Sequence, residues 1–110
     1  MNAIMLEEML GEMIKCERAV RSGKGVEYTK SEEDQLSNFK KEAGTLGVSP
    51  LVVWAIYYNK HHTAIMNYVK TGKTFSDETI QGRILDCRVY LWLLRGLIED
   101  LTTAQREEPF

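Results

Sequence analysis

Apolar residues recur at helical spacing over about 77–104 and cover almost the whole circumference of the predicted helix. At roughly 100° per residue, one seam of apolar residues consists of Ile80, Ile84, Cys87, Leu91, Leu94, Ile98 and Leu101. A second apolar face contains Leu85, Val89, Trp92 and Gly96. A helix with so little polar surface is expected to pack on most of its sides.

Between these two faces lies a third strip that mixes charge with apolar bulk. It consists of Arg83, Asp86, Tyr90, Leu93 and Leu97. The breadth of the apolar surface predicts that Arg83 and Asp86 are at least partly buried, and buried charge is costly unless it is paired. This strip is therefore the first place to look for function.

Two further long helices are predicted over about 2–22 and 50–70. The first has apolar residues at helical spacing, and closely spaced glycines at Gly23 and Gly25 end it. The second has a strong start signal, because Ser49 is a good N-cap and Pro50 suits the first helical position. It is expected to end at Gly72.

A shorter helix precedes the second long one. Its start signal is a near-variant of a capping box formed by Ser31 and Asp34. Its apolar residues are Leu36, Phe39 and Ala43, and it is expected to end near Gly44 or Gly47. The segment 23–30 has no firm assignment.

These patterns predict an all-α fold, a small bundle of about four helices in a single domain over 1–110, with a frayed tail from about 105. The last helix is expected to start at a cap formed by Ser76 or Asp77. Its apolar breadth is covered either by the other helices of the same chain or by another copy in a homo-oligomer.

Composition narrows the class of protein. The chain has 110 residues, of which 44% are hydrophobic and 27% charged, as in ordinary globular proteins. The net charge of −2 argues against wholesale nucleic-acid binding. The sequence contains no run of about 18 apolar residues, so it predicts no membrane span. Cys16 and Cys87 both lie in helical patterns and are expected to be small core residues of a reduced, cytoplasmic protein.

One candidate for chemistry is the sequence Asn59-Lys60-His61-His62. Adjacent histidines project about 100° apart on a helix, so they do not chelate one metal as an i, i+4 pair would. His61 continues an apolar seam and could be a hydrogen-bonded core histidine. Lys60 could reach an anion, although a half-exposed polar turn explains the same residues.

Acidic residues offer a second candidate. Glu8 and Glu12 share one face of the first helix, and Glu78 and Asp86 belong to the last helix or its start. If the two pairs faced each other they could hold magnesium, which prefers oxygen ligands. A pair of acids on a helix is more often a solvated surface, so no metal ligand is assigned.

Arg83, Asp86 and Tyr90 are the third candidate, at i, i+3 and i+7. An Arg83–Asp86 pair within the helix is a sufficient structural explanation. Alternatively, Arg83 binds a phosphate or carboxylate through two hydrogen bonds, Asp86 orients it and Tyr90 stacks on the ligand or donates to it. The residues leave both open. A glycine-containing basic loop over 70–74 lacks the spacing of a P-loop and is expected to be an ordinary connection.

Several short motifs resemble, in their order, a known group of proteins. They are Gln-Leu-Ser-Asn-Phe-Lys at 35–40, Leu-Gly-Val-Ser-Pro at 46–50, Asn-Lys-His at 59–61 and E-x-I-x-G-R-I-x-D-x-x-x-Y at 78–90. Together they resemble small phage and prophage helical proteins related to the nucleotide modification-associated domain. That group is distantly similar to the all-α nucleoside triphosphate pyrophosphohydrolases of the MazG and dimeric dUTPase type.

The resemblance implies nucleotide chemistry but departs from the catalytic pattern. The pyrophosphohydrolases hold magnesium with an ExxE on one helix and an ExxD on a later one. Asp86 matches the closing aspartate, whereas Arg83 stands at the place of the glutamate and reverses its charge. That change weakens a metal site and leaves phosphate binding intact.

Two hypotheses follow. The first is a small phage-type nucleotide-binding protein of nucleotide metabolism. In it, Arg83, Lys60 and His61 hold phosphate, Asp86 orients Arg83 or a magnesium ion, and Tyr58 or Tyr90 contacts the base. No catalytic residue is assigned. The alternative is a non-enzymatic inhibitor or ligand-sequestering protein that acts through an oligomeric surface.

Overall fold

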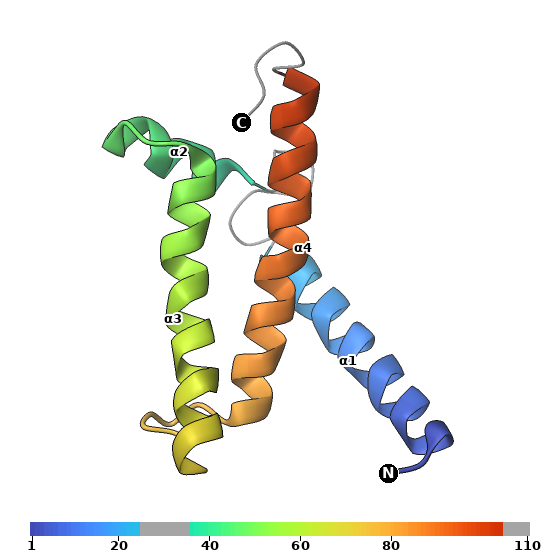
Figure 1. Cartoon of the computed structure of the whole chain (residues 1–110). Helices are drawn as coiled ribbons and strands as arrows, with labels where there is room; N and C mark the ends of the chain where they lie inside the picture. The colour runs from blue at the N-terminus through green and yellow to red at the C-terminus, as the bar shows by residue number, and fades with distance from the viewer. Residues whose placement is uncertain (25–35, 105–110) are drawn as a thin grey trace. The chain divides into compact units, whose positions relative to one another are not determined.

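The computed structural model describes residues 1–24 and 36–104, and within them the chain is all-helical with no strand. The four helices are α1 (Ala3–Lys24), α2 (Ser37–Leu46), α3 (Pro50–Thr71) and α4 (Ile80–Ala104) (Figure 1). The predicted all-α bundle class is confirmed. The predicted cap at Ser31 and Asp34 and the frayed tail from about 105 lie outside the described residues, as does most of 23–30.

The chain divides into two compact units, Met1–Gln35 and Leu36–Phe110. The first unit contributes one described helix, α1, whose first turn is capped by Asn2: its Oδ1 accepts a hydrogen bond of 2.9 Å from the Met5 backbone N–H. Large apolar side chains of α1 are exposed. The prediction that Cys16 is a core residue is wrong, because Cys16 is exposed as well.

The second unit is built on α3, whose ends follow the signals in the sequence. Ser49 is the N-cap and its Oγ accepts a hydrogen bond from the Leu51 N–H, with Pro50 in the first turn. Gly72 ends the helix with φ at 71°, a left-handed conformation that glycine adopts without the steric cost of a Cβ. Gly47 ends α2 in the same way, with φ at 70°.

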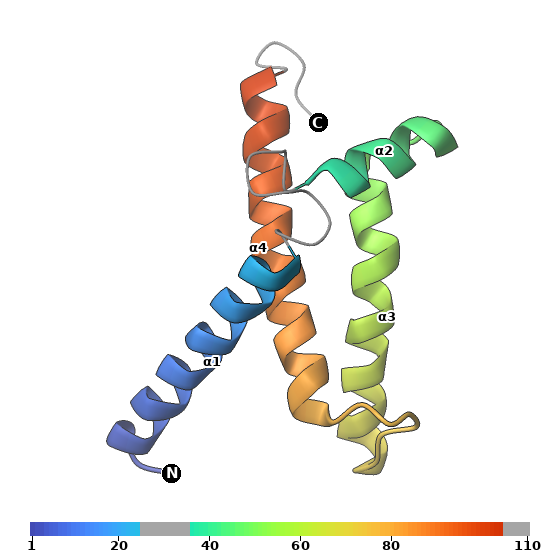
Figure 2. The ribbon, with the colours of Figure 1, turned by 180° about the vertical axis from the view of Figure 1, so that it is seen from behind.

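Helices α3 and α4 run side by side and are joined at one end by the segment 72–79, while α2 lies against the other end of α3 (Figures 1 and 2). The Trp54 indole N–H of α3 donates to the Tyr90 carbonyl of α4 at 2.6 Å, in a partly buried position. At the α2 end, Lys40 Nζ and Asp100 Oδ2 are 2.9 Å apart and link α2 to α4.

The core of this unit lies where the three helices meet. Its buried members are Leu36, Phe39, Ala43, Val53 and Leu97. The partly buried side chains packed against them are Leu51, Trp54, Tyr90 and Leu93. The predicted apolar face of α2 is thus the face that is buried, because each of its three members enters this cluster.

Helix α4 departs from the prediction at its start. It begins at Ile80, and the cap is Thr79 in place of Ser76 or Asp77: the Thr79 Oγ1 accepts a hydrogen bond of 3.0 Å from the Gly82 N–H. Ser76 and Asp77 belong instead to the connecting segment. This places the Ser76 hydroxyl where it can contact a side chain of α4.

The expected burial of α4 on most sides is also only partly realised. Leu97 and Val89 are buried, and Arg83 and Asp86 are partly buried, as predicted. The seam residues Ile84, Leu91 and Ile98 are exposed, although α3 packs along α4. None of the helices in the described residues is long and apolar enough to cross a membrane.

Candidate functional site

Arg83, in the first turn of α4, is the centre of a polar cluster at the α3–α4 turn. Its Nη1 lies 3.2 Å from the Glu78 Oε2 and its Nη2 donates to the Ser76 Oγ at 3.3 Å. Only 11% of the Arg83 side chain is exposed, against 51% of the Glu78 side chain. Ser76 and Glu78 therefore hold the guanidinium in place, and the Glu78 side chain is about half exposed to solvent.

His61 of α3 is shared between the two charged residues of α4. Its Nδ1 lies 3.3 Å from the Arg83 Nη1 and 3.5 Å from the Asp86 Oδ2. A guanidinium can only donate, which requires a bare Nδ1, whereas a carboxylate can only accept, which favours Nδ1–H. The protonation state and the tautomer of His61 therefore decide which of these two contacts is a hydrogen bond.

The surroundings of His61 favour its neutral form. Burial lowers the pKa of the imidazole below its ordinary value of 6.5 and Arg83 lowers it further, while the Asp86 carboxylate opposes this shift. The Tyr90 ring lies against the imidazole, with the ring centroids 5.1 Å apart. In the neutral form the tautomer with the proton on Nε2 leaves the Nδ1 lone pair to accept a hydrogen bond from Arg83, and the imidazole then helps to orient the guanidinium.

This arrangement predicts a pH dependence of stability that is specific to His61. Its pKa is lower in the folded chain than in the unfolded one, so the unfolded chain takes up the proton first as the pH falls. His61 is expected to cost no stability above about pH 6.5 and to destabilise the fold progressively below it. Urea unfolding at about pH 7.5 and about pH 5.5 measures this loss.

The comparison is made with His61→Gln, which cannot take up a proton. This variant is expected to lose less free energy of unfolding than the wild type between the two pH values. His62→Gln removes an exposed histidine from the same helix and is expected to keep the wild-type loss. An equal loss in wild type and His61→Gln would contradict the prediction.

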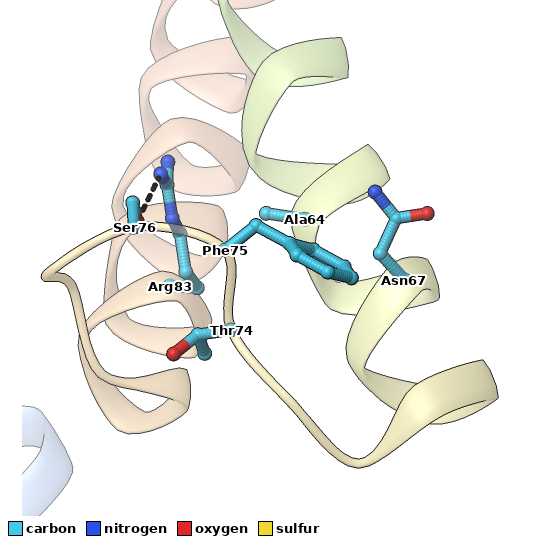
Figure 3. A pocket seen from close by; sticks show the side chains of 6 residues that line it. All are labelled: Ala64, Asn67, Thr74, Phe75, Ser76 and Arg83. Atoms are coloured by element: carbon cyan, nitrogen blue, oxygen red, sulfur yellow. Dashed lines mark hydrogen bonds between the residues drawn. The ribbon is translucent and has the colours of Figure 1, made fainter.

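A pocket of about 130 Å³ opens beside Arg83. Its lining residues are Ala64, Asn67, Thr74, Phe75, Ser76 and Arg83. In Figure 3, Ala64 and Asn67 come from α3, Arg83 comes from α4, and the Phe75 ring lies between them. Phe75 is 75% exposed, which is unusual for a large apolar ring and leaves one of its faces available to a ligand.

The structure brings together four of the six predicted ligand-binding residues: His61, Arg83, Asp86 and Tyr90. Of these, Arg83 alone lines the pocket. The predicted Arg83–Asp86 pair is replaced by two pairs, Arg83 with Glu78 and Asp86 with His61.

The other two predicted residues, Lys60 and Tyr58, do not line the pocket. Lys60 is exposed on α3. Tyr58 belongs to an aromatic row along α3: its ring stacks on Trp54, with centroids 4.7 Å apart, and contacts His62 at 5.8 Å. A role for Tyr58 at the same ligand as Arg83 therefore has no support from the geometry of the pocket.

The sequence reasoning missed the pocket residues Asn67, Thr74, Phe75 and Ser76. Asn67 and Ala64 share a helical face with Lys60, at i+7 and i+4. This spacing is the one feature of the sequence that could have indicated that Asn67 lies on the same face as a predicted ligand-binding residue. The segment 72–79 has no periodicity, so nothing in the sequence indicates that Phe75 and Ser76 lie beside Arg83.

No group of three or more His, Cys, Asp or Glu side chains suited to a metal ion occurs among residues 1–24 and 36–104. Glu8 and Glu12 belong to one compact unit and Glu78 and Asp86 to the other. The sequence assigns no metal ligand among these four residues, and magnesium binding by them stays an untested alternative.

Comparisons with known proteins add no relative to this picture. No protein-family model matches the chain, and no match was found among curated proteins or among solved structures. The resemblance to the nucleotide modification-associated domain therefore stays a prediction from the motifs at 35–50 and 59–90.

Proposed function

We propose that this protein binds a phosphate-bearing ligand of the nucleotide class in the pocket at the α3–α4 turn. The observation that carries the proposal is the place of Arg83, a largely buried guanidinium that lines a pocket together with a hydroxyl, an amide and an exposed aromatic ring. A guanidinium matches the geometry of phosphate oxygens and can donate two parallel hydrogen bonds to them.

The contacts of Arg83 support binding of an anion rather than a purely structural role. Ser76 and His61 orient the guanidinium, and Glu78 occupies the place of an anionic partner. Because about half of the Glu78 side chain is exposed, its carboxylate can move into water when a phosphate takes its place. The largely buried guanidinium therefore has a negatively charged partner both before and after the phosphate binds.

The aromatic ring of Phe75 and the amide of Asn67 would contact the part of the ligand that carries the base. Phe75 offers a face on which a planar base can stack, and the Asn67 amide can donate and accept hydrogen bonds at its edge. At about 130 Å³ the pocket is smaller than the roughly 300 Å³ of typical small-molecule sites. It would therefore enclose part of a nucleotide, with the base on Phe75 at its rim.

A thermal-shift panel of nucleoside mono-, di- and triphosphates, with and without magnesium, tests the proposal. A ligand that binds only the folded state at about 100 times its Kd adds about 2.7 kcal/mol, which raises the Tm of a domain of this size by about 10 °C or more. Pyrophosphate, which carries no base, is tested in parallel to separate binding of the phosphates from binding of the base. An unchanged Tm with every compound would refute the proposal and leave the alternative of an interaction protein.

Arg83→Ala is expected to weaken binding by about 10- to 100-fold, since hydrogen bonds to charged groups contribute about 1.5–3 kcal/mol. Arg95→Ala is the matched control, because Arg95 is an exposed arginine of the same helix that pairs with Glu99. Glu78→Gln is expected to tighten binding by removing the competing carboxylate. If Arg83→Ala bound as tightly as Arg95→Ala, the site would lie elsewhere.

Phe75→Ala separates the two halves of the site. It is expected to weaken the binding of nucleotides and to leave pyrophosphate binding unchanged, because only the base would contact the ring. Hydrolysis that requires magnesium and is lost in Asp86→Asn would indicate an enzyme of the pyrophosphohydrolase type in place of a binding protein.

A further inference from the structure

The pocket at the α3–α4 turn has a single cation in its lining. Of the described residues that line it, Arg83 is charged and the others are neutral. Two carboxylates lie close to the guanidinium. The Glu78 Oε2 is 3.2 Å from the Arg83 Nη1, and the Asp86 Oδ2 is 3.5 Å from the same His61 Nδ1 that the guanidinium contacts. The pocket therefore offers a ligand one positive charge with two negative charges beside it.

Phosphate binding at Arg83 exchanges one anion for another. The Glu78 carboxylate carries one negative charge, and its side chain is exposed enough to move into water. A singly charged phosphate that takes its place leaves the charge around the guanidinium unchanged. A doubly charged phosphate adds a negative charge that Asp86 repels and that no second cation in the described lining compensates.

The cost of removing the ligand from water also favours the single charge. The attraction between an anion and one guanidinium grows in proportion to the charge of the anion, whereas the cost of desolvation grows with the square of that charge. Only 11% of the Arg83 side chain is exposed, so a phosphate in contact with it gives up part of its own hydration. A singly charged phosphate is thus the better match to this guanidinium.

Ser76 provides a second donor beside the guanidinium. Its Oγ accepts a hydrogen bond of 3.3 Å from the Arg83 Nη2 (Figure 3) and one of 3.4 Å from the Glu78 backbone N–H. These two bonds use both lone pairs of the hydroxyl oxygen, so its hydrogen is left to donate. Arg83 and Ser76 can therefore donate to two oxygens, and a phosphodiester has two unesterified oxygens.

Exposed lysines do not change this balance of charge. Lys60, Lys70 and Lys73 are all exposed, and none of them lines the pocket. The charge of an exposed ammonium is solvated and is screened by salt, so it contributes little to holding an anion in the pocket.

We infer that the ligand of this pocket is a phosphodiester, a singly charged phosphate joined to a base that stacks on Phe75. The inference rests on the proposed function and narrows the class of nucleotide. Phosphodiesters occur in 3′,5′-cyclic nucleotides and in the internal link of dinucleotides. Their chemistry at Arg83 is the same in both.

Two ligands that differ by one charge test the inference. Adenosine 5′-monophosphate is doubly charged at about pH 7.5, because the second pKa of a phosphate ester is about 6. Its methyl ester keeps the base and the sugar but is singly charged. Isothermal titration calorimetry with the full chain is expected to give a Kd about 10-fold lower for the methyl ester.

The outcomes separate this inference from the proposed function. Equal affinities, or tighter binding of the monophosphate, would overturn the phosphodiester and leave nucleotide binding at Arg83 in place. If neither compound bound and the nucleotide panel also left Tm unchanged, both would be overturned.

A second cation in the pocket tests the physical cause. Thr74→Lys adds one to the lining and is expected to remove the preference for the methyl ester. Thr63→Lys is the matched control, because Thr63 is an exposed threonine of α3 outside the lining, and it should keep the preference. A preference that Thr74→Lys left unchanged would show that the charge of the pocket does not cause it.

Two natural phosphodiesters distinguish the sources of the ligand. Both 3′,5′-cyclic AMP and the dinucleotide ApA are expected to bind more tightly than a doubly charged phosphate would allow, with adenosine 5′-monophosphate as the common reference. The tighter of the two identifies a cyclic nucleotide or a dinucleotide link as the source. Weaker binding of both than of adenosine 5′-monophosphate would exclude the phosphodiester class.

Discussion

Phe39→Ala is expected to destabilise the α2–α4 unit by about 3–5 kcal/mol, the usual cost of removing a buried aromatic ring. Phe39 is 9% exposed and belongs to the core where the three helices meet. Its ring contacts Tyr57 and Tyr90 edge-on, with centroids 6.3 and 6.2 Å away. Such edge-to-face pairs add about 0.5–1.5 kcal/mol to the effect of burial.

This loss is a large part of the free energy of unfolding of a small domain, which is about 5–15 kcal/mol. Urea unfolding followed by circular dichroism measures it. Phe75→Ala is the matched control, because it removes the same side chain from a 75% exposed position and is expected to change stability by less than about 0.5 kcal/mol. Similar losses in the two variants would mean that Phe39 is not a core residue.

Leu97→Ala is expected to cost about 2–5 kcal/mol, since the surrounding side chains cannot fill the cavity completely. Leu97 has an exposed fraction of 0% and packs in the same core as Phe39. Leu91 lies on the same helix but is 48% exposed. The two Leu→Ala changes have the same effect on helix propensity, so the difference between them isolates the packing of Leu97.

Leu91→Ala is accordingly expected to cost clearly less than Leu97→Ala in the same urea titration. If the two variants lost equal free energy, the exposed face of α4 would be covered in solution and the core would extend across it. A dimer that used the exposed face of α4 would produce that result, and a lower molar mass of Leu91→Ala than of the wild type in solution would reveal it.

Much of the fold could be read from local signals. The Ser49 and Pro50 start of α3, its end at Gly72 and the buried face of α2 depend on residues close together in the sequence. A helical period determines which residues share a face, and capping depends on side chains within one turn. The partial burial of Arg83 and Asp86 followed from the same periodicity.

The candidate site could be predicted only in part. Arg83 and His61 were found because each lies on a helical face with apolar neighbours. Asn67, Phe75 and Ser76 are not found from the sequence. The Arg83–Asp86 pair is one of the two interpretations that the sequence leaves open, whereas in the structure Glu78 faces the guanidinium and Asp86 faces His61. The i, i+3 spacing permits the Arg83–Asp86 pair, but Glu78 of the segment 72–79 and His61 of α3 compete for these residues.

The sequence by itself therefore determined the all-α class, both ends of α3, the buried face of α2 and the partial burial of Arg83 and Asp86. The tertiary structure decided the start of α4 at Ile80, the partners of Arg83 and the pocket beside Phe75. The reason is that caps and periodicity are local, whereas ion pairs across helices and the course of the segment 72–79 depend on how α3 and α4 pack.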